Sequence, residues 1–283
     1  MPERNKSGRR VYSDADIQRL SMLAELCSLG HSIGQVANWS DEQLQQNLKK
    51  LGKIEQLSAG KSQNPVGQNF VDTKESLDNL LLALKLYKLD VISHEFNKLK
   101  LLLSPRQLAL DILTPLLKEV GEAVIKGDLR LSQEQALISL IRFHVGSVLY
   151  RQVEHKSKKS AEILLTSPEG DYNEIGLMLS ALLCAHYNLN FYYLGPNLPL
   201  SSVLDTVHSI SITDVIIGSD PKLHDRQMNY LVQYLEMLLH KLGSNQSVVL
   251  RGASSKSDLK FSKDKRFHHA KSLYDLDHYL KNF

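Results

Sequence analysis

The C-terminal part of the chain alternates short apolar segments with longer helical ones, and this alternation limits the fold more than any other feature. Residues typical of buried strands occupy 161–166, 190–194, 213–218, 247–250 and 267–270. Segments with a helical pattern occupy 175–187, 200–210, 224–242 and 272–281. Strands joined by helical crossovers form a parallel sheet with helices on both faces. We therefore expect residues 158–283 to form a doubly wound, flavodoxin-like α/β domain, with ligands bound beyond the carboxyl ends of its strands.

A helical period runs through residues 74–155, which contain no strand signal. Apolar residues recur there at three- and four-residue steps, as in Leu77, Leu80, Leu81 and Leu84. The Ser104-Pro105 pair favours a helix start, Gly127 a helix end and Ser132 a further start. These signals predict a bundle of four antiparallel helices, and core packing accounts for its leucines.

The first 57 residues form a smaller segment with its own signals. Basic residues around Ser7-Gly8 precede a Val-Tyr pair, which predicts a tight hairpin. Helices are expected from Ser13, from Ile33 and from a cap at Ser40. Residues 58–73 are polar and contain two glycines and one proline, which is typical of a linker.

Composition excludes several classes of protein. A net charge of +3 is too mild for a polybasic nucleic-acid binder, so any such contact needs a local patch. The two cysteines, Cys27 and Cys184, cannot form a disulfide framework or a four-thiolate zinc site. The longest apolar run, at residues 175–187, is shorter than the roughly 18 residues of a spanning helix. We expect a cytoplasmic protein that does not enter a membrane.

Motifs in all three segments resemble MerR-family transcription regulators whose sensory half is a cobalamin-binding module, the CarH and LitR type of light-responsive repressor. The N-terminal segment carries the resemblance in PERNKSGRRVYSDADIQRL and HSIGQVANWSDEQLQ. The later segments carry it in PLLKEVGEAVIKGDLRLSQEQAL, EGDYNEIGLMLSALL and YYLGPNLPLSSVLDTV. The resemblance implies a partial winged-helix DNA-binding domain over 1–57, a cobalamin-cap-like bundle over 74–155 and a Rossmann-like domain over 158–283.

In this family the wing follows a helix-turn-helix, whereas Met1 stands just before the wing. The resemblance therefore implies that the recognition helix is missing, through an internal start or a truncation. The wing residues expected to contact DNA are Arg4, Lys6, Arg9, Arg10 and Tyr12. Such contacts to phosphates carry little sequence discrimination. An exposed basic terminus without a partner is the alternative.

The resemblance also implies a way to hold cobalamin, from which this sequence departs. Family members carry an acid-x-His-x-x-Gly motif, in which the histidine ligates cobalt and the acid orients its ring. The motif here reads Asp171, Asn173 and Gly176, so an amide replaces the imidazole. An amide oxygen suits cobalt poorly. We expect Asn173 instead to close the loop through a hydrogen bond to Asp171 or a neighbouring backbone group.

Other positions around the expected cofactor also differ from the family pattern. The family's tryptophan corresponds to Val124, and its Glu-His pair corresponds to Glu134 and Gln135. Its Ser-x-Leu/Thr corresponds to Ser219-Asp220-Pro221, and its Gly-Gly corresponds to Arg251-Gly252. Valine cannot cover an adenosyl group as an indole does, and the arginine would fill the room that the nucleotide tail needs. We therefore regard these cofactor-binding positions as vestigial and expect no cobalamin. Base-on binding through shape alone is the alternative.

Nothing in the sequence indicates catalysis or a metal site. His268-His269 has no carboxylate partner at metal-ligand spacing and is expected in a solvated loop. His144 and His186 lie in apolar helices, where packing explains them. There is no P-loop and no G-x-G-x-x-G after the first strand. We expect a chain that is not an enzyme.

These observations favour a MerR-type regulator that binds DNA as a homo-oligomer. A protein partner is one candidate for its signal. Two alternatives stay open: a light-responsive regulator that binds cobalamin, and a DNA-independent interaction protein that modulates a full-length relative. The operator, the target genes and the sign of regulation do not follow from the sequence.

Overall fold

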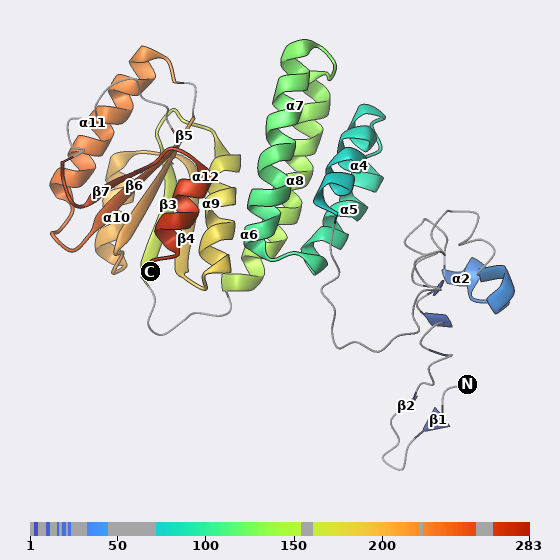
Figure 1. Cartoon of the computed structure of the whole chain (residues 1–283). Helices are drawn as coiled ribbons and strands as arrows, with labels where there is room; N and C mark the ends of the chain where they lie inside the picture. The colour runs from blue at the N-terminus through green and yellow to red at the C-terminus, as the bar shows by residue number, and fades with distance from the viewer. Residues whose placement is uncertain are drawn as a thin grey trace. The chain divides into compact units, whose positions relative to one another are not determined.

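The structure is a computed structural model, drawn in Figure 1. It describes residues 3–4, 10–11, 16, 19–20, 22–23, 33–44, 72–153, 161–220, 223–252 and 263–283. The chain divides into two compact units, residues 1–69 and residues 70–283. Within the described residues, every helix is too short or too polar to cross a bilayer.

The first unit contains the predicted hairpin. Strand β1 (Glu3–Arg4) pairs antiparallel with β2 (Arg10–Val11). Helix α2 (Ile33–Val36) begins where the sequence predicts. Ser40 caps the next helix, because the Gln43 N–H donates to Ser40 Oγ at 3.2 Å. The hairpin turn, the Ser13 helix start and nearly all of the predicted linker lie outside the described residues.

The predicted four-helix bundle is confirmed as the first part of the second unit. Its helices are α4 (Thr73–Lys85), α5 (Leu89–Leu102), the composite of α6 (Pro105–Gln107), η1 (Leu108–Leu113) and α7 (Thr114–Lys126), and α8 (Leu131–Val153). Ser104 and Gln107 form a capping box at the start of α6. Gly127 ends α7 with a φ of 82°, a left-handed conformation that favours glycine.

Two local features of the bundle differ from the prediction. The stretch η1 is a π-helix, and it ends two residues before Pro115, which has no N–H to donate and crowds the preceding turn. The Thr114 N–H and hydroxyl both bond to the Ala109 carbonyl, which fixes the wider turn. The predicted helix start at Ser132 is wrong. Helix α8 begins at Leu131, because Gln133 Oε1 accepts the Arg130 N–H at 2.8 Å.

The predicted doubly wound domain is also confirmed. Its strands are β3 (Glu162–Pro168), β4 (Asn190–Leu198), β5 (Asp214–Ser219), β6 (Ser247–Gly252) and β7 (Phe267–Ala270). All pair in parallel, in the order β4-β3-β5-β6-β7, which is the flavodoxin-like order. Its helices are α9 (Glu174–His186), α10 (Leu200–Ser209), α11 (Asp225–Lys241) and α12 (Leu273–Leu280).

Helix α9 is buried on nearly all sides. Every residue from Gly176 to Ala185 is buried, because α9 lies between the sheet and α8 (Figure 1). One apolar core therefore continues from the sheet through α9 into the bundle. Helices α10 and α11 pack with a second core on the opposite face of the sheet.

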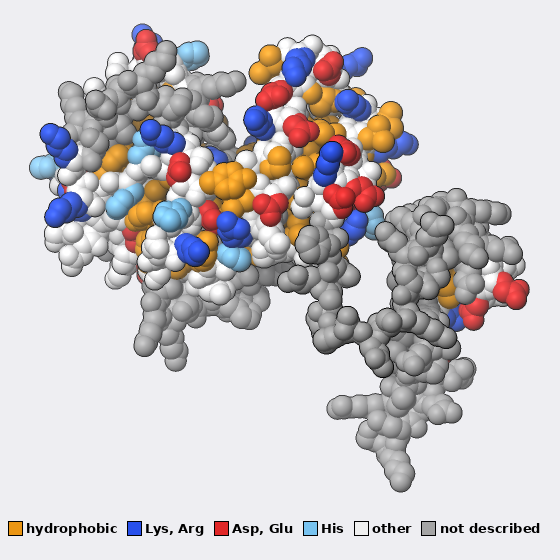
Figure 2. All heavy atoms as spheres, viewed as in Figure 1, with side chains coloured by type: hydrophobic (Ala, Val, Ile, Leu, Met, Phe, Trp, Pro, Cys, Tyr) orange, Lys and Arg blue, Asp and Glu red, His pale blue; other side chains and the backbone are white. Residues whose placement is uncertain are grey.

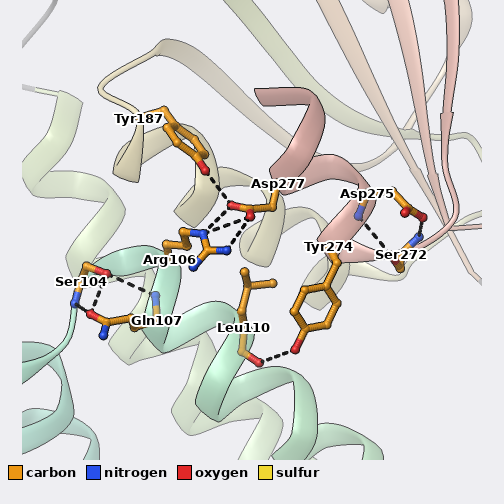
Figure 3. A network of polar contacts seen from close by, with 9 residues as sticks. All are labelled: Ser104, Arg106, Gln107, Leu110, Tyr187, Ser272, Tyr274, Asp275 and Asp277. Carbon is orange, nitrogen blue, oxygen red and sulfur yellow. Dashed lines mark hydrogen bonds and ion pairs between the residues drawn. The ribbon is translucent and has the colours of Figure 1, made fainter. Parts of the chain in front are cut away.

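Polar contacts fix the bundle on the α/β domain (Figure 3). Arg106 donates three hydrogen bonds of 2.7 to 3.0 Å to the Asp277 carboxylate, and the Tyr187 hydroxyl donates a fourth of 2.9 Å. A second ion pair joins Arg142 Nε of α8 to Glu174 Oε2 at the start of α9, at 2.7 Å. The bundle and the sheet thus form one body in which α9 is the shared element.

Candidate functional site

The loops after β3 and β5 converge at the carboxyl edge of the sheet. Strand β3 lies between β4 and β5 in the sheet. The connection after β3 leaves toward the α9 face, and the connection after β5 leaves toward the α11 face. Such a divergence of connections opens a crevice between neighbouring loops, where doubly wound domains bind ligands. The predicted site residues of the domain lie at this edge.

Asp171 connects the two loops. Its Oδ1 accepts the Asn173 N–H at 2.9 Å, and its Oδ2 accepts the Asp220 N–H at 2.9 Å. Its backbone carbonyl accepts the Ser167 hydroxyl at 2.7 Å. The loop closure expected of Asn173 is therefore made by its backbone N–H, whereas its side chain makes no capping bond to α9. Because both carboxylate oxygens hold backbone groups, Asp171 keeps the loops together within the protein itself.

Arg251 covers the first turn of α9. A Cβ placed on Gly176 would lie 2.0 Å from Arg251 Nη1, so the guanidinium rests directly on the glycine. Strand register places Gly218 and Ala270 on either side of Arg251. The Arg251 side chain thus occupies the space between β6 and the first turn of α9, which we call the crevice.

The Arg251 guanidinium has no counter-charge close to it among the residues that the structure describes. Burial alone lowers the pKa of this side chain. Among the residues that the structure describes, none forms an ion pair or hydrogen bond with its guanidinium. The charge is thus held in place by packing and by the shape of the crevice.

Gly252 and Ser219 lie side by side at the ends of β6 and β5. Gly252 has a φ of 95°, and a Cβ there would lie 2.3 Å from the Ser219 carbonyl oxygen, so only glycine fits. The Ser219 side chain is buried, and its Oγ has no hydrogen-bond partner among the described residues. Ser219 also lines a cavity of about 410 Å³ under the start of α11.

The predicted bundle positions lie around the α7–α8 turn. This turn is at the same end of the unit as the carboxyl ends of the strands (Figure 1). Val124 is half-buried and packs on the core, Glu134 is half-buried, and Gln135 is exposed. Within residues 72–153 and 161–220, none of the three forms a described hydrogen bond with Asp171, Asn173 or Ser219.

The predicted DNA-contacting residues are described only in part. Arg4 and Arg10 face each other as register partners in the hairpin. Lys6, Arg9 and Tyr12 lie outside the described residues. Figure 2 shows acidic and basic side chains interspersed over the visible face of the bundle, which does not provide the basic stripe of a nucleic-acid surface.

The histidines considered in the sequence analysis, where the contacts are described, contact groups within the fold. His144 Nε2 lies 3.0 Å from Ser93 Oγ, and burial, aided by Lys100, lowers its pKa. The solvated loop expected at His268-His269 is wrong, whereas the extended piece expected near residues 267–270 is confirmed, because both histidines belong to β7, which pairs with β6. His269 Nε2 contacts the Gly252 carbonyl at 3.0 Å. In the described part of the chain, no cluster of His, Cys, Asp or Glu could hold a metal ion.

Comparisons with known proteins find matches for both the N-terminal segment and the second unit. Residues 1–43 match the family described as "MerR HTH family regulatory protein". The structure superposes on the monomethylamine corrinoid protein of Methanosarcina barkeri with a TM-score of 0.56 and 15% identity, over 75% of this chain and 100% of that protein. The chain therefore joins a MerR-type N-terminus to a helical bundle and an α/β domain of the cobalamin-binding type.

The sequence is also similar to a transcriptional repressor. The chain is 26% identical over 198 residues to the HTH-type transcriptional repressor CarH of Myxococcus xanthus. The matched stretch covers 70% of this chain and 62% of CarH. The chain is thus a distant homologue of CarH, and it spans about three fifths of the length of that protein.

Proposed function

We propose that the chain is a DNA-binding transcription regulator whose sensory unit works without cobalamin. The match of residues 1–43 to MerR regulators and the distant homology to CarH support the DNA-binding part. DNA would be contacted by the hairpin that holds Arg4 and Arg10, through phosphates, in a homo-oligomer. The proposal assigns no catalytic step to any residue.

The position of Arg251 carries the cobalamin-independent part of the proposal. Its guanidinium rests on Gly176, in the crevice between β6 and α9. A group inserted beside Gly176 would have to expel this side chain. Asn173 supplies no imidazole for cobalt, and Asp171 is already bonded to two backbone N–H groups. The residues present therefore do not fit the cofactor.

Cobalamin binding tests this directly. The purified chain is incubated with adenosyl-, methyl- and hydroxocobalamin and passed over a size-exclusion column, and absorbance at corrin wavelengths is recorded across the protein peak. We expect a colourless protein peak with each compound. A corrinoid that co-elutes in a one-to-one ratio would overturn the proposal.

Two variants test separately the two obstacles to cobalamin binding. Arg251→Ala opens the crevice, and Asn173→His restores the imidazole. We expect neither substitution alone to give tight binding, because each leaves the other obstacle in place. Lys241→Ala is the control, since Lys241 is exposed in the last turn of α11. Tight uptake by Asn173→His alone would contradict the role given to Arg251.

DNA binding is tested by selection from a random duplex library, followed by mobility shifts at several salt concentrations. We expect an enriched operator whose affinity falls steeply with salt. Arg4→Ala and Arg10→Ala are each expected to reduce the salt slope by about 1 without changing sequence preference. Lys241→Ala, on α11 in the second unit, is the control. Failure to enrich any duplex would remove the DNA-binding part and favour an interaction protein.

A further inference from the structure

A cavity of about 410 Å³ lies beneath the first turns of α11. The loop of residues 168–171 after β3 forms one wall, and the start of α11, including Tyr230 and Leu231, forms the opposite wall. Ser219, at the end of β5, lies between them. This volume is in the range of pockets that hold small organic ligands. The cavity lies on the α11 side of the sheet, whereas Arg251 lies on the α9 side.

The described lining of the cavity is mostly apolar and carries two acids and one base. Pro168, Leu223 and Leu231 contribute aliphatic surface, and Tyr230 contributes an aromatic ring. Glu169 and Arg226 have opposite charges, and both are exposed. The remaining acid, Asp171, has both carboxylate oxygens bonded to backbone N–H groups. A neutral molecule therefore suits the apolar interior better than an ion, which would lose its hydration there.

One polar group in this wall has no partner in the part of the chain that the structure describes. Ser219 is only 3% exposed, and its Oγ makes no hydrogen bond to any described residue. The missing side chain of Gly218 would face Leu177 of α9, so the next residue, Ser219, faces the opposite side, where α11 and the cavity lie. A buried hydroxyl without a partner carries a desolvation cost, which a ligand with a hydrogen-bonding group would remove.

We propose that this cavity binds a neutral, largely apolar ring compound that forms one hydrogen bond with the Ser219 hydroxyl. The ring lies between Tyr230 and the loop of residues 168–171. The compound is the effector of the regulator, and this role, unlike the binding itself, rests on the proposed function. The cavity would thus receive the signal on the face of the sheet opposite the crevice that Arg251 fills.

The test uses two probes with the same ring system. N-phenyl-1-naphthylamine is neutral, carries one N–H and fluoresces strongly in apolar surroundings. Its 8-sulfonate adds a negative charge to the same rings. In a titration of the full chain followed by fluorescence, we expect saturable one-to-one binding of the neutral probe and at least fivefold weaker binding of the sulfonate. Absence of saturable binding, or tighter binding of the sulfonate, overturns the inference.

Variants locate the site. Ser219→Ala is expected to weaken binding of the neutral probe by about three- to tenfold, because it removes the hydrogen bond, while the ligand-free protein melts at an equal or higher temperature. Tyr230→Ala is expected to weaken binding at least fivefold through loss of the aromatic wall. Met237→Ala, at another exposed position of α11, is the matched control and leaves the affinity unchanged.

The outcomes distinguish this inference from the proposed function. Unchanged affinity in Ser219→Ala and Tyr230→Ala would show that the probe binds elsewhere and would overturn the inference. Cobalamin exclusion and DNA binding are measured without either probe, so each proposal can fail while the other stands. A change in operator affinity when the neutral probe is added supports the effector role, and an unchanged operator affinity at saturating probe overturns that role.

Discussion

Removing Arg106 is expected to destabilise the second unit by about 2–3 kcal/mol, because it leaves the Asp277 carboxylate buried without its guanidinium. The Asp277 side chain is 10% exposed, whereas that of Arg106 is 38% exposed. Breaking a fully buried pair costs about 3–5 kcal/mol. The lower figure applies here because water already reaches the guanidinium and because the Tyr187 hydroxyl still donates to Asp277 in the variant.

The same exposures predict an asymmetry between the two partners. In Asp277→Ala the Arg106 side chain can turn toward water, so we expect a loss of only about 1–2 kcal/mol. The double variant loses both charges together and is expected to resemble Asp277→Ala. The two substitutions should therefore show a coupling energy of about 2 kcal/mol. Lys118→Ala, an exposed position on α7, is the control and should stay within about 0.5 kcal/mol.

The stability lost in Arg106→Ala should depend on pH in a defined direction. Burial acts to raise the pKa of Asp277, but the hydrogen bonds from Arg106 and Tyr187 outweigh it and hold the pKa below its usual range. A lowered pKa in the folded state means that the carboxylate stabilises the fold above the unfolded pKa of about 3.9, and that this contribution is lost as the pH falls further. In Arg106→Ala, burial dominates and the pKa rises. The loss of unfolding free energy caused by Arg106→Ala should therefore be largest near pH 7 and become smaller toward pH 4.

The assay is urea unfolding followed by far-UV circular dichroism at pH 7 and at pH 4.5, on the full chain. Urea is preferred because guanidinium chloride would screen the ion pair. An Arg106→Ala variant within 0.5 kcal/mol of the parent at pH 7 would refute the reasoning. So would a double variant whose loss equals the sum of the two single losses.

Three further predictions concern single positions. Gly252→Ala should cost at least about 2 kcal/mol in urea unfolding, because its Cβ would lie 2.3 Å from the Ser219 carbonyl oxygen at a φ of 95°; wild-type stability would contradict this. Gly127→Ala should cost about 1 kcal/mol by the same assay, since its φ of 82° ends α7, and a stabilised variant would contradict this. Burial raises the pKa of the Cys184 thiol, so in a Cys27→Ser chain this thiol should react with Ellman's reagent only after denaturant is added.

Sequence patterns predict the strands well, because their signals are local. All five predicted strands occur, and the predicted strand at Phe267–Ala270 has the observed bounds. Strand β4 extends to Leu198, four residues beyond its prediction, because its last residues pair irregularly with β3 across register shifts. The pairing partner that sustains this extension comes from a distant part of the chain. The residue pattern of β4 alone therefore does not show where the strand ends.

Features that depend on contacts between segments are predicted less well. The apolar run of α9 indicates burial, but burial on all sides follows only once the bundle packs on it. The junction of Arg106 and Asp277 joins residues 171 positions apart and has no sequence motif. The cavity under α11 likewise combines two loops and one helix face. Tyr230 and Arg226 carry no signal of this role in a single sequence.

The site itself illustrates why a motif can persist after its ligand is lost. Asp171 and Gly176 keep the acid and glycine of the family pattern, and each has a partner within the chain. Asp171 holds the Asn173 and Asp220 backbone N–H groups, and Gly176 makes room for the Arg251 guanidinium. Replacing either residue would therefore disturb the loops even in a chain that never binds a cofactor. Retention of these two residues is thus explained by loop structure and does not by itself indicate cobalamin.

A signal received beneath α11 would have a short physical route to the bundle. The loop of residues 168–171 that lines the cavity continues directly into α9, and Asp171 ties it to the loop after β5. Helix α9 contacts α8, with Glu174 in its first turn paired to Arg142. A ligand that shifts the loop must therefore move or strain this ion pair. Glu174→Gln should consequently weaken any effect of the neutral probe on operator affinity while leaving probe affinity unchanged, whereas an undiminished effect would exclude this route.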